Sequence, residues 1–270
     1  NGWSSNDWVR IWDIFVENGG LLLMGRAGTG KTWAAKMMVE NKKFLKLAFT
    51  NKATLQLGGK TIHSALGINM EGKMDRKLIK QISRNYDGIV VDEISMVSID
   101  LFKLLVLVKE ITGLPFLLVG DHRQLAPVEP EKEGENCYFH HPVVGYLCNH
   151  KSVELTKMMR YDKALWDFLE EVQINPDTPL PKSSGFMPSM IGEFNVCYFN
   201  KTRTHCNKQC NEYIAGKKEK TMKLEYTGNN HKYLQTTIVY EGLPVIVFKR
   251  GGSTGDKEVL KNEFATVVSF

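Results

Sequence analysis

The stretch GRAGTGKT, residues 25–32, is the main indication of the fold. It follows an apolar run at residues 21–24 and precedes a helical pattern over residues 33–40. It matches the phosphate-binding loop formula, with Gly25, four residues, and then Gly30, Lys31 and Thr32. A buried strand, this loop and a helix in succession predict an α/β domain that binds a nucleoside triphosphate. The alternative is a glycine turn without a ligand.

Each part of the loop has a chemical reason to be there. Glycines let backbone N–H groups surround phosphate oxygens, and the following helix N-terminus favours negative charge. Lys31 is expected to reach the β- and γ-phosphates of ATP, and Thr32 to coordinate Mg²⁺. The expected cofactor-binding residues of the loop are Gly25, Ala27, Gly28, Thr29, Gly30, Lys31 and Thr32.

Three further short apolar runs predict strands that are buried on both faces, at residues 44–49, 89–91 and 116–119. A helical pattern covers residues 99–111, and another near the N-terminus has Ser4 and Asp7 placed as a capping box. Strands that alternate with helices favour a parallel sheet whose ligands bind at the carboxyl ends of the strands. The Gly25 loop, Asp92-Glu93 and Gly120-Asp121 all follow strand ends, which supports a nucleotide site at that edge.

Asp92 and Glu93 follow the buried strand at residues 89–91. Asp92 is expected to hold Mg²⁺ together with Thr32, while Glu93 would orient and activate the attacking water. Gln124 is placed to sense the γ-phosphate, and Arg160 to stabilise charge that develops on it. An exposed acidic pair and a solvated arginine are the plain alternatives.

Composition excludes some classes of protein. The chain has 270 residues, 43% hydrophobic and 24% charged, with a net charge of +5, which is typical of a globular protein that tolerates a polyanionic partner. Neither a membrane-spanning run nor a signal peptide is evident. Five unpatterned cysteines favour a reducing intracellular compartment (cytoplasm, nucleus or viral replication site). A zinc site among Cys137, Cys148 and nearby histidines is an alternative whose spacing fits no familiar pattern.

The chain is expected to contain two domains. Residues 1–175 would form the first, with a helix at 164–172, and residues 176–194 read as a Pro- and Ser-rich linker. Residues 195–270 would begin a second domain, with a strand at 196–199 and a helix at 202–214.

Five motifs carry a resemblance to a known family. GRAGTGKT, AFTNKATLQLGGKTIHSALG, VVDEISM, VGDHRQLAPV and LTKMMRYD occur in order within residues 25–162. Their order and spacing resemble those of superfamily-1 DNA helicases, in particular the branch with the RecD subunit and the phage Dda helicase. The resemblance covers nearly the whole chain, but weakly after residue 165.

The resemblance implies a RecA-like motor that couples ATP hydrolysis to 5′–3′ movement on single-stranded DNA and to duplex unwinding. Its partners would be single-stranded DNA, duplex junctions and replication or repair proteins, with no membrane. Residues 67–84 occupy the place of a strand-splitting wedge, for which a solvated basic helix is the alternative. The residues implied to touch the strand are Thr50, Asn51, Thr61, His63 and Ser64. The alternatives are a helix cap at Thr50 or Asn51 and a buried, hydrogen-bonded histidine at position 63.

Two departures from the family pattern affect these expectations. Asp7 stands near the position of a glutamine that reads adenine, and a carboxylate cannot donate to ring N7, so the preference for ATP over other triphosphates stays open. The chain also ends before the family's later motifs, after segments that resemble the approach to an SH3-like insertion. We therefore expect an incomplete second motor domain and little hydrolysis by these residues alone. A nucleotide- and DNA-binding module without turnover, and an RNA helicase, are the rival interpretations.

Overall fold

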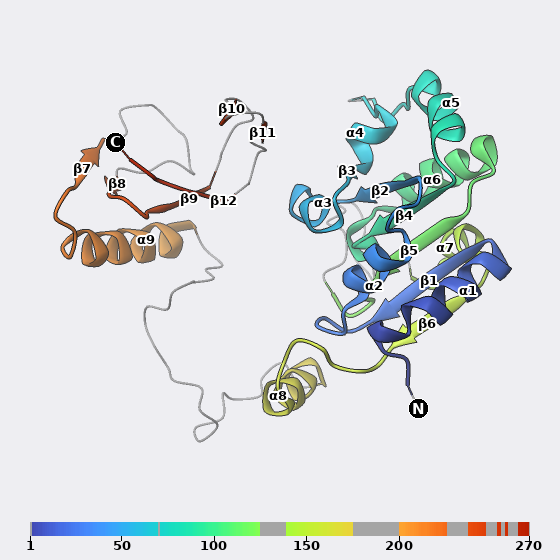
Figure 1. Cartoon of the computed structure of the whole chain (residues 1–270), viewed down its shortest axis with the longest axis horizontal. Helices are drawn as coiled ribbons and strands as arrows, with labels where there is room; N and C mark the ends of the chain where they lie inside the picture. Colours follow the sequence, from blue (N-terminus) through green and yellow to red (C-terminus); the bar gives the residue numbers. More distant parts are fainter. Residues whose placement is uncertain are drawn as a thin grey trace. The chain divides into compact units, whose positions relative to one another are not determined.

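The computed structural model describes residues 2–69, 71–124, 139–174, 200–225, 237–246, 253–254, 257–258 and 264–269. The chain divides into two compact units, Asn1–Asp177 and Thr178–Phe270 (Figure 1). The expected linker at 176–194 and strand at 196–199 lie outside the described residues. Among the helices of the described part, none is long and apolar enough to cross a membrane.

The first unit is built on a six-stranded sheet with the order β3-β2-β4-β5-β1-β6. All its strand pairings are parallel. The strands are β1 (Gly20–Gly25), β2 (Phe44–Ala48), β3 (Lys60–Thr61), β4 (Gly88–Asp92), β5 (Phe116–Gly120) and β6 (Ser152–Leu155). This arrangement confirms the predicted parallel α/β fold and the four predicted strands of this unit.

Helices cover both faces of the sheet, as Figure 1 shows. Helices α1 (Trp8–Asn18), α2 (Lys31–Met38) and α3 (Asn51–Leu57) contribute to one hydrophobic core. Helices α4 (Ile62–Leu66), α5 (Arg76–Asn85), α6 (Ile99–Thr112) and α7 (Pro142–Leu147) contribute to the core on the other face. Burial on both faces is why β4 and β5 consist of uninterrupted apolar runs, with Asp92 at the end of β4 and Asp121 directly after β5.

The N-terminal segment is held by the expected capping box. The side chain of Ser4 accepts a hydrogen bond from the amide of Asn6, and Asp7 accepts one from the amide of Ser4 at 2.8 Å. A short 3₁₀ turn (Ser5–Asp7) then leads into α1, whose Ile11 and Phe15 are buried. Trp3 bridges to Leu155 of β6, so the N-terminus continues the edge of the sheet.

β6 was not expected from the sequence, which shows only a weak pattern after residue 130. Along this strand Val153 and Leu155 are buried while Ser152 is exposed, because β6 lies at the edge of the sheet. Four residues that alternate in this way give little signal. Helix α8 (Lys163–Ile174) follows β6 and is the last element of the first unit, close to the predicted helix at 164–172.

The described part of the second unit contains helix α9 (Asn200–Ala215), which includes the predicted helix at 202–214, and three antiparallel strand pairs. Asn211 fastens the helix to β8, since its amide bonds both the N–H and the C=O of Ile238 at 2.8 Å. The strands are β7 (Met222–Leu224), β8 (Thr237–Val239), β9 (Pro244–Ile246), β10 (Ser253–Thr254), β11 (Lys257–Glu258) and β12 (Phe264–Thr266). The predicted SH3-like insertion is not confirmed by these pairs.

Candidate nucleotide site

The loop between β1 and α2 has the backbone of a phosphate cradle. Gly28 has φ 88° and Gly30 has φ 83°, in a region that side chains other than glycine rarely adopt. Gly30 is the residue that caps α2. Thr29 is fully buried, and its hydroxyl donates to the carbonyl of Arg26 at 2.8 Å. The loop is thus shaped before any ligand arrives, with Ala27 exposed at its tip.

Lys31 points back into this loop. Its Nζ donates to the carbonyl oxygen of Arg26 at 2.9 Å. Burial lowers the pKa of Lys31, while the nearby carboxylates of Asp121, Asp92 and Glu93 oppose that shift. The ammonium group therefore lies among three acidic side chains at the carboxyl edge of the sheet, where the sequence predicted it.

Asp92 and Thr32 meet across the site. The Thr32 side chain hydrogen-bonds the Asp92 carboxylate, which also accepts from the amide of Glu93 at 2.8 Å. Asp92 is only 3% exposed, and burial raises the pKa of its carboxyl group. A hydroxyl beside a buried carboxylate is a donor set that suits Mg²⁺. Within the described residues, no group of three or more His, Cys, Asp or Glu side chains is placed to hold a metal ion.

Glu93 lies beside Asp92 but has different surroundings. It has φ 56° and ψ 44°, a left-handed conformation that is uncommon for a residue with a side chain. The hydroxyl of Thr50 donates to Glu93 Oε2 at 3.1 Å. The kinked backbone sends the two adjacent carboxylates to different partners, Asp92 to Thr32 and Glu93 to Thr50.

Asp121 and Arg160 complete the surroundings of Lys31. Asp121 is buried at the end of β5, and among the charges around Lys31 it raises the lysine pKa most. Arg160 is exposed, and its charge lowers the pKa of Lys31, which places it in the same electrostatic environment. Gln124 is exposed, and its backbone N–H donates to the backbone carbonyl of Asp121 at 3.1 Å. The remainder of that motif, residues 125–128, lies outside the described residues.

The residues expected to touch a nucleic acid strand lie at the carboxyl ends of β2 and β3. Thr50 caps α3 by accepting from the amide of Ala53, and Thr61 caps α4 by accepting from the amide of Ser64. His63 and Ser64 are exposed, and Asn51 is half-buried. The helix-cap alternative is confirmed for Thr50. The alternative of a buried, hydrogen-bonded histidine is wrong for His63, because its side chain is exposed. Contact with a strand stays a prediction for all five.

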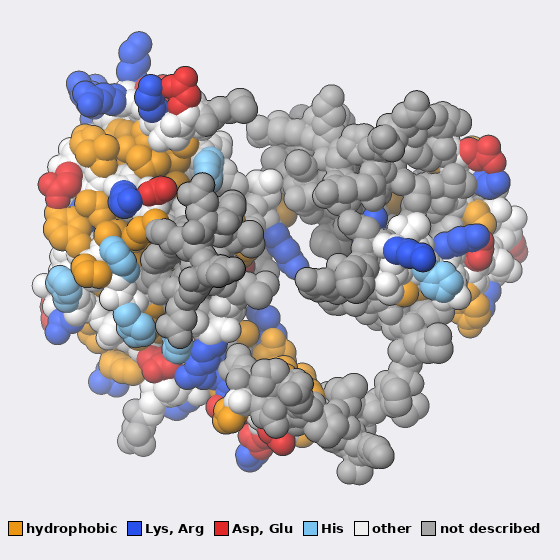
Figure 2. All heavy atoms as spheres, turned by 180° about the vertical axis from the view of Figure 1, so that it is seen from behind, with side chains coloured by type: hydrophobic (Ala, Val, Ile, Leu, Met, Phe, Trp, Pro, Cys, Tyr) orange, Lys and Arg blue, Asp and Glu red, His pale blue; other side chains and the backbone are white. Residues whose placement is uncertain are grey.

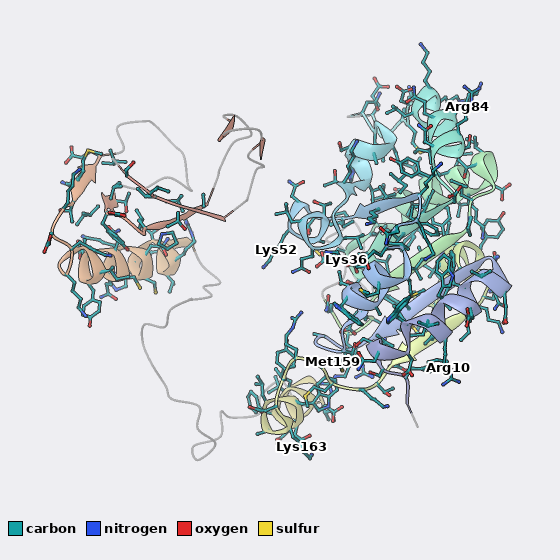
Figure 3. The ribbon with its side chains drawn as sticks, in the orientation of Figure 1. Arg10, Lys36, Lys52, Arg84, Met159 and Lys163 are labelled. Carbon is teal, nitrogen blue, oxygen red and sulfur yellow. The ribbon has the colours of Figure 1, made fainter. Side chains whose placement is uncertain are left out.

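The basic segment at residues 67–84 ends in helix α5. Its Ile79 and Ile82 pack into the core, and its opposite face is exposed and basic. Figure 2 shows Lys and Arg side chains gathered at this end of the unit, and Figure 3 shows Arg84 on its outer surface. The basic residues of that face are Arg76, Lys77, Lys80 and Arg84. A wedge and a solvated helix both fit this arrangement.

These residues fit Mg²⁺ and a triphosphate. The loop amides and Lys31 would hold the phosphates, and Thr32 and Asp92 would hold the ion. Bound there, Mg²⁺ would neutralise charge on the β- and γ-phosphates. Glu93 would then be left free of the ion and could accept a proton from water. Asp7, which stands near the position of the family's adenine-reading glutamine, accepts a hydrogen bond from the backbone amide of Ser4 in the capping box. The preference for ATP over other triphosphates stays open.

Sequence reasoning missed two residues that contact the loop, Arg26 and Tyr161. Both lie within motifs that had been identified, but at positions those motifs leave open. Asp121 was identified at the end of a predicted strand, but without a role of its own. A side-chain carbon added to Gly28 would lie 2.6 Å from the Tyr161 ring, so this ring packs directly on the loop.

The chain is similar in sequence to proteins named as ATP-dependent DNA helicases. A family described as an AAA domain matches residues 11–130. The chain is 26% identical over 183 residues to the ATP-dependent DNA helicase Pif1 of Bdellovibrio bacteriovorus, covering 60% of this chain and 41% of that protein. It is 28% identical over 190 residues to human ATP-dependent DNA helicase PIF1, covering 63% of this chain and 30% of that protein. The resemblance to superfamily-1 helicases is confirmed. Their Pif1 and RecD branch is the one that it matches.

Solved Pif1 structures share the fold. Pif1 helicase from Candida albicans aligns with a TM-score of 0.62 and 19% identity, over 98% of this chain and 68% of that one. Bacteroides Pif1 bound to single-stranded DNA aligns with a TM-score of 0.65 and 18% identity, over 100% of this chain and 70% of that one. The six-stranded sheet described above therefore has the fold of the RecA-like domain in these structures. The chain spans less than half the length of the Bdellovibrio bacteriovorus and human Pif1 proteins.

Proposed function

We propose that this chain is the motor portion of an ATP-dependent DNA helicase that moves 5′ to 3′ on single-stranded DNA. The observation that carries the proposal is the division of labour at the end of β4. Asp92 is bonded to Thr32 where Mg²⁺ would bind, whereas Glu93 is turned away to Thr50. A site that only held nucleotide would not need the second carboxylate.

The position of Thr50 supports coupling between hydrolysis and a nucleic acid. Its hydroxyl contacts Glu93 and also caps α3, at the sheet edge where Asn51, Thr61 and Ser64 lie. Small hydroxyl and amide side chains can bond phosphates without reading sequence, which suits a motor that must move along any sequence. Nucleotide and strand would thus meet on neighbouring strand ends of one sheet.

The nucleotide roles of the loop residues, the phosphate-sensing role of Gln124 and the charge-stabilising role of Arg160 are part of this proposal. So are a second motor domain that begins at about residue 195 and a duplex-splitting role for residues 67–84. The names of the relatives support DNA as the substrate. Replication and repair proteins as partners are part of the proposal. Such a motor would act in a compartment that contains DNA.

The test uses the whole protein of which this chain is the motor portion, because these 270 residues alone are expected to hydrolyse little ATP. It measures ATP hydrolysis with no nucleic acid, with single-stranded DNA and with single-stranded RNA. We expect stimulation by DNA above RNA, binding that weakens with added salt, and unwinding of duplexes that carry a 5′ tail. Lys31→Ala is the control for contaminating activity. Stimulation by RNA alone would indicate an RNA helicase, and nucleotide binding without turnover would indicate a binding module. Either result refutes the proposal.

A further inference from the structure

Arg26 is the second residue of the phosphate-binding loop, at a position that the loop formula leaves open. It is nevertheless only 8% exposed. Its guanidinium group lies 4.3 Å from the centre of the Trp166 ring and forms an ion pair with Glu170. Trp166 and Glu170 lie one turn apart on helix α8, so both face the loop. A charged side chain is rarely buried without such partners.

The backbone of Arg26 faces the other way, into the nucleotide site. Its carbonyl oxygen accepts from Lys31 Nζ at 2.9 Å and from the Thr29 hydroxyl at 2.8 Å. One residue therefore contacts α8 with its side chain and the phosphate-binding lysine with its main chain. A phosphate in the loop would compete with this carbonyl for Lys31, so ligand binding changes the forces on Arg26.

A second attachment joins the segment before α8 to the same loop. The amide of Met159 donates to the carbonyl of Gly28 at 2.9 Å, and the Tyr161 ring packs on Gly28. Asp162 then caps the helix, since its carboxylate accepts from the amide of Leu165 at 2.8 Å. Arg160 lies in the sequence between Met159 and Tyr161, the two residues that contact Gly28. Figure 3 shows Met159 between α8 and the rest of the first unit.

We propose that Arg26, Trp166 and Glu170 form a positioning clamp that couples occupancy of the nucleotide site to helix α8. This inference rests on the proposed function, because it needs the loop to bind a nucleotide. Helix α8 is the last element of the first unit, so a clamp here links the phosphate-binding loop to the part of the chain that leads into the second unit. The coupling is reciprocal: nucleotide alters α8, and a displaced α8 alters nucleotide affinity.

The first test compares the affinity of the 270-residue chain for a fluorescent ADP analogue with Mg²⁺. Trp166→Leu keeps an apolar side chain but removes the aromatic face, and Glu170→Gln removes the ion pair. Each should weaken binding by about 2- to 30-fold, the range that the loss of one such contact corresponds to. Glu171→Gln, at the exposed neighbouring position on α8, is the matched control and should bind like the wild type.

The second test follows amide hydrogen exchange in residues 163–174 with and without Mg²⁺ and ADP. Nucleotide should change the exchange of α8 in the wild type and in Glu171→Gln, but not in Arg26→Met. If Arg26 only supported the fold, Arg26→Met would leave the nucleotide-dependent change in α8 exchange as it is in the wild type. Circular dichroism checks that each variant is folded, and Glu170→Gln carries the test if the larger changes unfold the chain.

The outcomes separate the two proposals. If the wild type binds no nucleotide, the proposed function is refuted and the clamp with it. If the wild type binds but Trp166→Leu and Glu170→Gln do so equally well, the clamp alone is refuted. The same holds if nucleotide leaves α8 exchange unchanged in the wild type, or if Glu171→Gln weakens binding as much as Glu170→Gln.

Discussion

Replacing Glu93 by glutamine tests whether Glu93 and Asp92, the two carboxylates at the end of β4, have different roles. The change removes one charge and keeps the shape of the side chain. The glutamine amide oxygen can still accept from the Thr50 hydroxyl, as Oε2 of Glu93 does at 3.1 Å. The Glu93 amide, which donates to Asp92 at 2.8 Å, is unchanged. We therefore expect the free energy of unfolding to stay within about 0.5 kcal/mol of the wild type.

The same change should remove the proton acceptor for the attacking water. Loss of a general base typically lowers the rate by about 10²–10⁴-fold, which corresponds to about 3–5 kcal/mol of transition-state stabilisation. Affinity for Mg²⁺ and nucleotide should change little, because Lys31, Thr32 and Asp92 remain. Single-turnover hydrolysis and nucleotide titration of one preparation of the whole protein measure the two quantities.

Asp92→Asn is the matched comparison. Its amide oxygen can also accept from Thr32, but the charge that would hold Mg²⁺ is gone, so affinity should fall together with the rate. If Glu93→Gln lowers affinity as much as turnover, or if both variants give the same pattern, the two carboxylates share one role. The division of labour inferred from Thr50 and Thr32 would then be wrong.

Three further predictions concern single groups. Lys31→Ala should weaken nucleotide binding by about 10- to 150-fold, the equivalent of one hydrogen bond to a charged group; unchanged affinity in a titration would remove this lysine from the site. Burial raises the pKa of Asp92, so without ligand the folded state holds an extra proton above pH 3.8, and the free energy of unfolding should fall as pH rises from there through the raised pKa. Denaturant unfolding at several pH values should show this slope in the wild type and not in Asp92→Asn. Ser4→Ala removes the acceptor for the Asn6 amide and should cost about 0.5–2 kcal/mol; an unchanged thermal midpoint would mean that the capping box does not stabilise the first unit.

Much of the first unit could be predicted from its sequence because its strands are buried on both faces. β1, β2, β4 and β5 are short apolar runs, and an apolar run that ends in polar residues is a strong signal. β6 was not predicted because its Ser152 and Glu154 alternate with two buried residues at a sheet edge. β3, with two residues, is too short to show any period.

The candidate site divides in the same way. Lys31, Thr32 and Asp92 were predictable because the chemistry fixes their residue types at a constant distance along the chain from a strand end. The contact of Thr50 with Glu93 joins residues 43 positions apart, and that of Arg26 with Trp166 joins the phosphate-binding loop to a helix that lies outside the motifs. Such contacts depend on where side chains are placed by the completed sheet, which no local pattern encodes.

The pairing of β1 has a consequence for how this protein is made. The strand that carries the phosphate-binding loop is hydrogen-bonded to β5 on one side and β6 on the other, and both leave the ribosome long after it. At about 5–20 residues per second, β1 waits on the order of 5–25 seconds for its two neighbours. During that time its apolar residues are exposed beside a glycine-rich loop, so a chaperone that binds apolar segments should engage this nascent chain before residue 155 emerges.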